Sequence, residues 1–223
     1  MLLAVLAACA PLRRAPAPPA PSAPLLPSAP SAPLGSLETP DHERIDAWEN
    51  RLRTHPQLRR ETAESLARGS RYLPGLRRIL EANGVPPSLA LLPVIESGFY
   101  PTARGRRGER GLWQLRRATA RRFGLVVNAH RDDRLAPERA TRAAARYLHV
   151  LYEHYGDWPL ALAAYNAGEH RVDRALARSP DASFWQLADR GYLPRTSREY
   201  VPRFFAVVRV AGEREPTAVG SAL

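Results

Sequence analysis

Residues 137–168, PERATRAAARYLHVLYEHYGDWPLALAAYNAG, decide the fold class of this chain. Pro137 is a favoured first residue of a helix, and Gly156 is a favoured residue just after one. Between them, the positions on one side of such a helix carry small, apolar or aromatic side chains: Thr141, Ala144, Tyr147, Leu148, Leu151 and Tyr155. Asp157 suits the N-cap of a second helix over 158–167, and Gly168 suits its end. The stretch therefore predicts two consecutive helices joined by a short turn.

The rest of the chain from about residue 41 also follows the helical period and shows almost no alternating pattern of strands. Ser88 is a candidate N-cap for a helix over 89–96. Asp181, and then Thr196 or Ser197, are candidate first residues of two later helices. The other expected helices cover 42–54, 57–82 and 111–123. Their connections are short, so the sequence predicts one compact all-α domain.

The chain is strongly basic. It has 223 residues and a formal net charge of +11, and all 33 of its basic residues are Arg. Such a charge suits nucleic acid, anionic lipid or an anionic wall polymer, and composition does not choose among them. Composition alone favours a simpler explanation, in which the Arg residues cover ordinary solvated helix faces. Cys9 is the single cysteine, and the six His residues show no HExxH pattern, so the sequence predicts no metal and no cofactor.

The N-terminus has the pattern of a targeting signal rather than of a folded segment. Residues 2–8, LLAVLAA, are apolar but far shorter than the ~20 residues of a membrane-spanning helix. They lead directly to Cys9, and Leu6-Ala7-Ala8-Cys9 resembles the lipobox of bacterial lipoproteins, in which the Cys is acylated. No basic segment precedes the apolar run, and a chance Cys is the competing explanation. Residues 10–40, rich in Ala and Pro, are predicted to form an extended tether.

One carboxylate stands in unusual surroundings. Within Leu91-Leu-Pro-Val-Ile-Glu-Ser-Gly98, Glu96 stands at the end of a predicted helix that is otherwise almost wholly apolar. A helix C-terminus and apolar neighbours both disfavour negative charge, so both favour a raised pKa of the kind that a general acid needs. This segment alone slightly favours the alternative of a Glu that simply points into solvent at the helix end.

Two further segments carry candidate ligand-binding side chains. Tyr165 and Asn166 stand side by side at the predicted end of the 158–167 helix, among small residues that allow close approach of another helix or of a ligand. Gln114 follows Gly111-Leu-Trp113 after a loop that is rich in Arg, and its amide can bind a sugar. Ordinary packing of Tyr165, capping by Asn166 and a core role for Trp113 are the structural alternatives.

Taken together, these segments are recognisable. The chain resembles the soluble-lytic-transglycosylase, goose-lysozyme-like family over roughly residues 72–212. The matching stretches stand in the family order: ALLPVIES at 90–97, GLWQ at 111–114 with ATA at 118–120, GDW at 156–158, ALAAYNAG at 161–168, LP at 193–194 and REYVP at 198–202. The resemblance implies an all-α, lysozyme-like catalytic domain of the goose type.

The resemblance also implies an enzyme and a set of roles. Glu96 would protonate the glycosidic oxygen of murein and then act as base toward the 6-hydroxyl of the same N-acetylmuramic acid, which leaves a 1,6-anhydro end. Tyr165 would sit close to Glu96 and orient it, Asn166 would help to hold the site, and Gln114 would contact the saccharide. Most glycosidases use a pair of carboxylates. No second Asp or Glu stands in these motifs, and an intramolecular nucleophile removes the need for one.

The chain departs from the family pattern in three places. Gly105 stands where the family usually has Ser, Glu109 where it has Ala, and Arg116-Arg117 where it has Met-Pro. These changes touch the expected groove, and Arg116 is a candidate ligand for a stem-peptide carboxylate. They also motivate the alternative of a catalytically weak or inactive peptidoglycan-binding module.

The sequence therefore predicts the following organisation: a lipoprotein signal over 1–9, a tether over 10–40, a helical extension over 41–71, the catalytic domain over 72–212 and a tail over 213–223. Lipidation at Cys9 would hold the protein on the periplasmic face of the outer membrane. The expected partners are peptidoglycan strands and that membrane. Nucleic acid is not an expected partner, because the Arg residues are spread over many helices and a lipobox directs the protein out of the cytoplasm.

Overall fold

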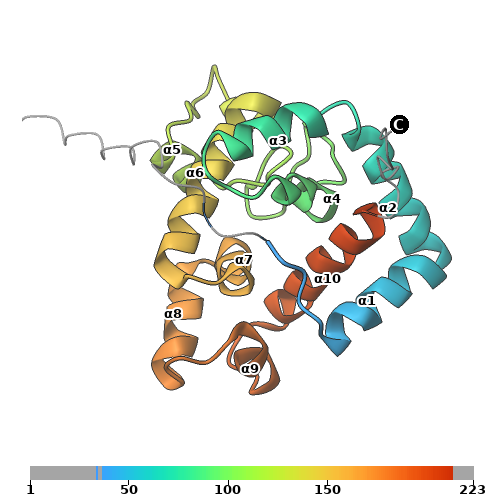
Figure 1. Ribbon diagram of the computed structural model, residues 1–223. Coiled ribbons are helices and arrows are strands. Elements are labelled where there is room, and N and C mark those ends of the chain that lie inside the picture. The colour runs from blue at the N-terminus through green and yellow to red at the C-terminus, as the bar shows by residue number, and fades with distance from the viewer. Residues whose placement is uncertain (1–33, 35–36, 213–223) are drawn as a thin grey trace, which may run out of the picture.

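The computed structural model describes residue 34 and residues 37–212, and within them all regular structure is helical (Figure 1). The prediction of an all-α, lysozyme-like fold is confirmed. The helices, including two short 3-10 helices (η), are α1 (Glu43–Thr54), α2 (Pro56–Gly69), α3 (Leu73–Glu81), η1 (Pro87–Leu91), α4 (Leu92–Glu96), α5 (Arg117–Arg122), η2 (Asp133–Leu135), α6 (Pro137–Tyr155), α7 (Trp158–Ala167), α8 (Glu169–Arg178), α9 (Phe184–Asp189) and α10 (Arg195–Gly212).

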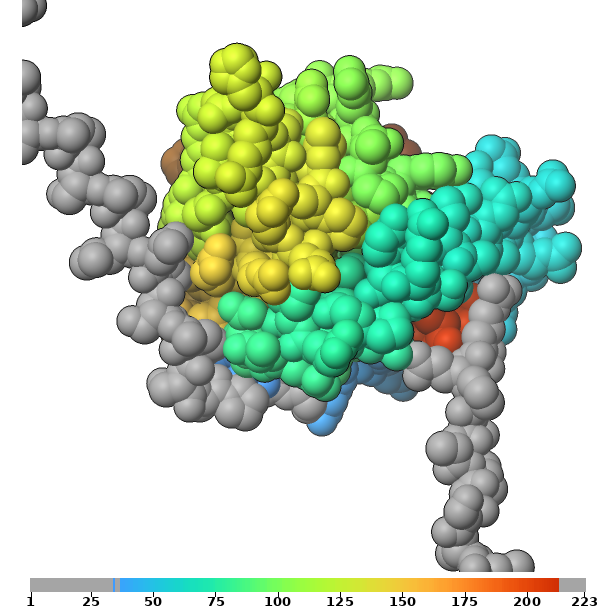
Figure 2. Space-filling view, turned by 90° about the horizontal axis from the view of Figure 1, so that it is seen from above, coloured from blue at the N-terminus to red at the C-terminus, as the bar shows by residue number. Residues whose placement is uncertain are grey.

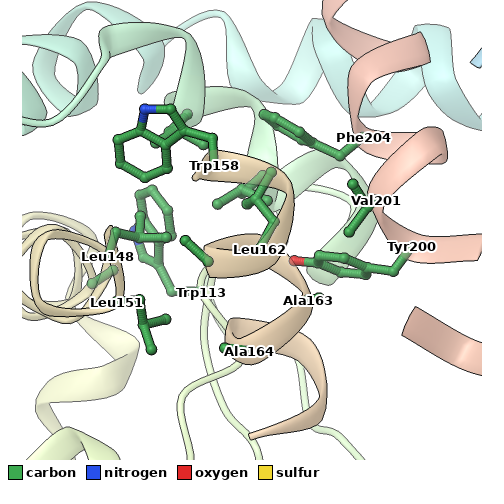
Figure 3. Close-up of a cluster of buried hydrophobic side chains, with 14 of the residues drawn as sticks. Trp113, Leu148, Leu151, Trp158, Leu162, Ala163, Ala164, Tyr200, Val201 and Phe204 are labelled. Atoms are coloured by element: carbon green, nitrogen blue, oxygen red, sulfur yellow. The ribbon is translucent and has the colours of Figure 1, made fainter. Parts of the chain in front are cut away.

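Helix α7 is the centre of the fold. It packs against α6 on one side and α10 on the other, with α8 and α9 also in contact (Figure 1). Its residues 158–164 are all buried, because small and apolar side chains cover its whole circumference. Figure 3 shows Leu148 and Leu151 of α6 on one side of α7, and Val201 and Phe204 of α10 on the other. Burying one such large apolar side chain contributes roughly 1.5–3 kcal/mol.

The local signals at both ends of α6 and α7 act as predicted. Pro137 opens α6, and Gly156 ends it with a left-handed backbone at φ 62°. The Asp157 carboxylate accepts a hydrogen bond from the Leu160 N–H and caps α7. The two predicted helices over 137–155 and 158–167 are therefore confirmed with their boundaries.

The helix expected over 57–82 is instead two helices. It ends at Gly69 and resumes as α3 at Leu73. Pro74 stands at the start of α3, and in a continuous helix its ring would clash with the carbonyl four residues earlier. Gly69 is also needed for close packing, since a Cβ there would lie 2.6 Å from the Phe99 ring.

The segment around Glu96 is shorter and more irregular than expected. Residues 87–91 form the 3-10 helix η1, in which Ser88 makes no capping hydrogen bond, and α4 spans only Leu92–Glu96. Pro93 lacks an N–H group and therefore starts a new helix rather than continuing one. Glu96 nevertheless ends its helix, as the sequence predicted.

The helix expected over 111–123 is limited to α5, Arg117–Arg122. The residues before it turn tightly, with Gly111 at φ 78° and Gln114 at φ 46°. A Cβ at Gly111 would lie 1.8 Å from the Arg134 carbonyl oxygen, so glycine is required where these two backbones meet. Figure 2 shows the segment between α4 and α6, green to yellow, beside α2 and α3 in turquoise.

The C-terminal third holds one helix that the sequence did not predict and two with shifted starts. Helix α8 follows Gly168 directly and buries Val172 and Ala175. Helix α9 is capped by Ser183 in a reciprocal hydrogen-bond pair with Gln186, rather than starting at Asp181. Helix α10 begins at Arg195, ahead of the predicted Thr196 or Ser197.

Candidate active site

The side chains predicted for the site meet at one cavity of about 450 Å³. Glu96 comes from the end of α4, Gln114 and Arg116 from the turn before α5, and Tyr165 and Asn166 from the end of α7. The cavity is lined by Glu96, Arg106, Arg107, Glu109, Gln114, Leu115, Arg116, Thr119, Tyr147, Tyr165, Asn166, Ala167, Gly168 and Glu169. Tertiary packing thus brings together segments about seventy residues apart in the chain.

Glu96 has the properties of a general acid. Glu96 is half-buried, and the first three residues of α4 (Leu92, Pro93 and Val94) are buried. Burial raises the pKa of Glu96 from its usual 4.5 to about 7, and the nearby charge of Glu109 acts in the same direction. A hydrogen bond from Tyr200 and the charge of Arg203 lower the pKa and only partly offset that rise. A carboxyl group of this kind holds its proton near neutral pH and releases it readily.

The residue that positions Glu96 is Tyr200, on α10. Its hydroxyl donates to the Glu96 Oε1 at 2.6 Å, and its ring is buried. Figure 3 shows the side chain reaching from α10 with its oxygen toward α7. Sequence reasoning assigned this residue no role, although it stands in the REYVP stretch at 198–202 that matched the family.

Tyr165 has a different task from the predicted one. It lies in the same cavity as Glu96, but its hydroxyl donates to the Trp113 carbonyl oxygen at 2.7 Å. The expectation that Tyr165 orients Glu96 is therefore corrected, because the hydrogen bond to the carboxyl comes from Tyr200. Burial and the charge of Glu96 both raise the pKa of Tyr165, which keeps it a neutral donor.

Asn166 and Gln114 are both fixed by hydrogen bonds. The Asn166 Oδ1 accepts from the Ser197 hydroxyl at 2.9 Å, which joins the end of α7 to α10. The Gln114 Nε2 donates to the Gly111 carbonyl oxygen at 2.8 Å and to that of Ala103 at 3.4 Å. Both amides therefore face the cavity in defined orientations, each with remaining capacity for a ligand.

A second carboxylate, Glu109, lies in the cavity. It accepts from the Arg107 N–H at 2.9 Å and forms ion pairs at 3.3 Å with the Arg107 and Arg116 side chains. Burial pushes the pKa of Glu109 upward, but its hydrogen bonds to backbone N–H groups and to Arg116 outweigh burial, so its pKa is lowered. Glu109 stands outside the family motifs, so the cavity holds a carboxylate besides the predicted acid/base Glu96. The Arg116 side chain, a candidate ligand for a stem-peptide carboxylate, is paired through its Nε with Glu109.

The all-helical fold is of the lysozyme-like class. The chain belongs to the transglycosylase SLT domain family, whose model matches residues 76–188. The expected resemblance to soluble lytic transglycosylases is confirmed.

Similar proteins agree with this assignment. The chain is 34% identical over 145 residues to membrane-bound lytic murein transglycosylase D of Escherichia coli, a match that covers 63% of this chain and 31% of that protein. It is 35% identical over 146 residues to peptidoglycan transglycosylase gp16 of Escherichia phage T7, covering 62% of this chain and 10% of that one. The match spans less than a third of either relative.

A solved structure has the same fold. The lytic transglycosylase Slt of Pseudomonas aeruginosa, an inactive mutant, superposes with a TM-score of 0.54 at 28% identity, covering 62% of this chain and 23% of that one.

The predicted lipidation site, Cys9, lies outside the described residues, as do the predicted signal and most of the tether. Among the residues that the structure describes, no helix combines the length and apolar character that a membrane span requires.

Proposed function

We propose that this chain is a lytic murein transglycosylase that cleaves the β-1,4 bond between N-acetylmuramic acid and N-acetylglucosamine and leaves 1,6-anhydro ends. The observation that carries the proposal is Glu96, a carboxyl group with a pKa of about 7 in a cavity of an SLT-family domain. Relatives named as murein or peptidoglycan transglycosylases support the same substrate.

The chemistry needs one group that first gives and then takes a proton. Protonated Glu96 donates to the glycosidic oxygen as the bond from that oxygen to the anomeric carbon breaks. The resulting carboxylate takes the proton of the 6-hydroxyl of the same muramic acid, whose oxygen bonds to the anomeric carbon. Glu96 ends protonated, ready for the next cycle. The hydrogen bond from Tyr200 holds the carboxyl in place and stabilises it while it is charged.

Four other side chains of the cavity serve substrate binding. Gln114 and Asn166 offer amide groups for hydroxyl and acetamido groups of the sugars. Tyr165 holds the backbone beside Gln114 in place through its hydrogen bond to the Trp113 carbonyl oxygen. Arg116 has donors left beyond its Nε, so it is available to an anionic stem peptide beside Glu109. These assignments make the cavity a sugar-binding site with a basic rim.

The cellular setting follows from the sequence. We infer a catalytic domain over 72–212, preceded by the extension 41–71 and carried on the tether 10–40 by a lipid at Cys9. The protein would then work on the periplasmic face of the outer membrane in wall remodelling. The net charge of +11 favours adhesion to anionic peptidoglycan.

Digestion of purified murein by the full-length protein, with mass spectrometry of the products, tests the proposal. We expect anhydro-ended muropeptides from the wild type and a loss of at least about a hundredfold in Glu96→Gln, which keeps the shape of the side chain without its proton. Full activity of Glu96→Gln would reject the assigned acid. Murein binding without any product would instead favour the alternative of a binding module.

A further inference from the structure

The catalytic cavity holds a carboxylate that single-acid chemistry does not use. Glu109 shares the lining of the cavity with Glu96, and its charge acts on the Glu96 carboxyl. It is partly buried, with 14% of its side chain exposed, so it is not a solvated surface group. A charged group that shares the cavity of the acid calls for a role.

The chain is built to admit this carboxylate. A Cβ at Gly105 would lie 2.5 Å from the Glu109 Oε2 and 2.9 Å from the Gln114 Oε1. Real Cβ atoms do not approach other atoms so closely, and the backbone of Gly105 is not left-handed. Glycine is therefore needed at 105 for space rather than for conformation, and the space it leaves is occupied by Glu109 beside Gln114.

The two oxygens of Glu109 are not equivalent. Oε1 lies 3.3 Å from the Nε atoms of both Arg107 and Arg116. Oε2 accepts from the Arg107 backbone N–H at 2.9 Å and is the Glu109 atom nearest to the position that a Cβ at residue 105 would take. A carboxylate oxygen has two lone pairs, so Oε2 keeps capacity for one more donor, such as a water molecule.

The protonation states of the two groups are complementary. At neutral pH much of Glu96 carries its proton, because burial raises its pKa to about 7, whereas hydrogen bonds and Arg side chains keep Glu109 ionised. Two carboxyl groups with pKa values pushed apart, one an acid and the other a base, form the machinery with which glycosidases activate water.

We propose that Glu109 gives this domain a hydrolytic route beside the transglycosylase route, so that part of its product carries free reducing ends. Glu96 donates its proton to the glycosidic oxygen as the bond to the anomeric carbon breaks. A water oxygen bonds to the anomeric carbon, and its proton passes to the Glu109 Oε2. Exchange with solvent then returns one proton to Glu96 and removes one from Glu109. The inference rests on the proposed cleavage of murein.

The experiment digests murein glycan with the full-length protein in water labelled with a heavy oxygen isotope. The glycan is first reduced with borohydride, because reducing ends that are already present would exchange their anomeric oxygen with the labelled water. Reducing ends made by hydrolysis then carry the label, whereas anhydro ends do not. The readout is the ratio of labelled reducing ends to anhydro ends. Both routes use the Glu96 proton, so this ratio is insensitive to changes in overall rate.

Three variants separate the role of Glu109 from general damage. Glu109→Gln cannot accept a proton, and we expect the ratio to fall at least about tenfold. Gly105→Ala keeps the carboxylate but forces it to move, so the ratio should fall there too. Glu169→Gln is the matched control: it removes a carboxylate of the same cavity that is held by Tyr147 and Arg122, and its ratio should match the wild type.

The outcomes distinguish the two proposals. Anhydro ends alone from the wild type would overturn the hydrolytic route and leave the proposed function standing. Labelled reducing ends in an unchanged ratio in Glu109→Gln would overturn the role of Glu109. If the wild type forms neither kind of end, the proposed function fails and the hydrolytic route fails with it.

Discussion

At the scale of single residues, the environment of Glu96 decides what the cavity can do. Burial and the charge of Glu109 raise its pKa, while the Tyr200 hydroxyl and the charge of Arg203 lower it. The balance lies at about 7, where a carboxyl group is both a usable acid and a usable base. Changing any one of these neighbours should shift the pH profile of the reaction in a direction that is known in advance.

Replacing Tyr200 by Phe removes the donor that stabilises the charged form of Glu96. The pKa of Glu96 should therefore rise, and the alkaline limb of kcat/KM should move upward by about one pH unit, because a hydrogen bond to a charged group contributes about 1.5 kcal/mol. A pH series of murein cleavage measures the shift. In Tyr165→Phe the limb should stay in place, since that hydroxyl donates to Trp113. A downward shift in Tyr200→Phe would contradict the assignment.

At the scale of structural elements, the segment between α4 and α5 is held from several directions. The Ser97 hydroxyl donates to the Leu112 carbonyl oxygen at 2.9 Å, and Tyr165 donates to that of Trp113. The Trp113 ring is fully buried, and its Nε1 donates to the Thr141 hydroxyl of α6 at 2.9 Å. These bonds fix an irregular segment, without its own regular structure, against the α6–α7 core.

Thr141→Val tests this attachment, because it keeps the shape of the side chain but leaves the Trp113 indole N–H buried without an acceptor. We expect the free energy of unfolding to fall by about 1–3 kcal/mol, the cost of an unsatisfied buried donor. Denaturant-induced unfolding provides the measurement. Thr141→Ser keeps the hydroxyl, so its free energy of unfolding should fall by less than that of Thr141→Val. Equal stability of the Val variant and the wild type would show that the bond does not hold the segment.

At the scale of the whole molecule, the buried carboxyl group of Glu96 lowers the free energy of unfolding when it is ionised. Residues of α6 and α7 line part of the cavity, and a carboxyl group ionises there only against the effect of burial. In the unfolded chain Glu96 has its usual pKa of 4.5, whereas in the folded chain it has about 7. The stability contributed by protonated Glu96 is fully present below pH 4.5 and is lost as the pH rises through about 7.

Glu96→Gln should therefore make the domain more stable above pH 7, by about 2–3 kcal/mol, and leave its stability unchanged below pH 4.5. Thermal or denaturant unfolding across this range measures the difference. Glu109→Gln should behave oppositely: the lowered pKa of Glu109 means that its charged form stabilises the fold, so the variant should be less stable at neutral pH. A Glu96→Gln variant that is destabilised at every pH would contradict the raised pKa.

The sequence by itself determined the helices whose ends are encoded locally. Pro137, Gly156, Asp157 and Gly168 fix φ angles or cap helix ends through neighbours a few residues away, so reading them needs no knowledge of the fold. The sequence also carried Glu96, Gln114 and Asn166 as candidates, through motifs in a family order. The prediction of one helix over 57–82 was wrong because it overlooked Pro74, which interrupts the helix between α2 and α3.

Only the tertiary structure decided how these residues act. Tyr200 meets Glu96 across 104 positions of sequence, because α10 packs beside α4. Glu109 enters the cavity because Gly105 leaves room for it, and a clash between side chains is invisible in a linear pattern. The pKa of Glu96 likewise depends on burial and on charges from other elements. Local signals set where helices begin and end, but solvent exclusion and contacts between distant segments set the chemistry.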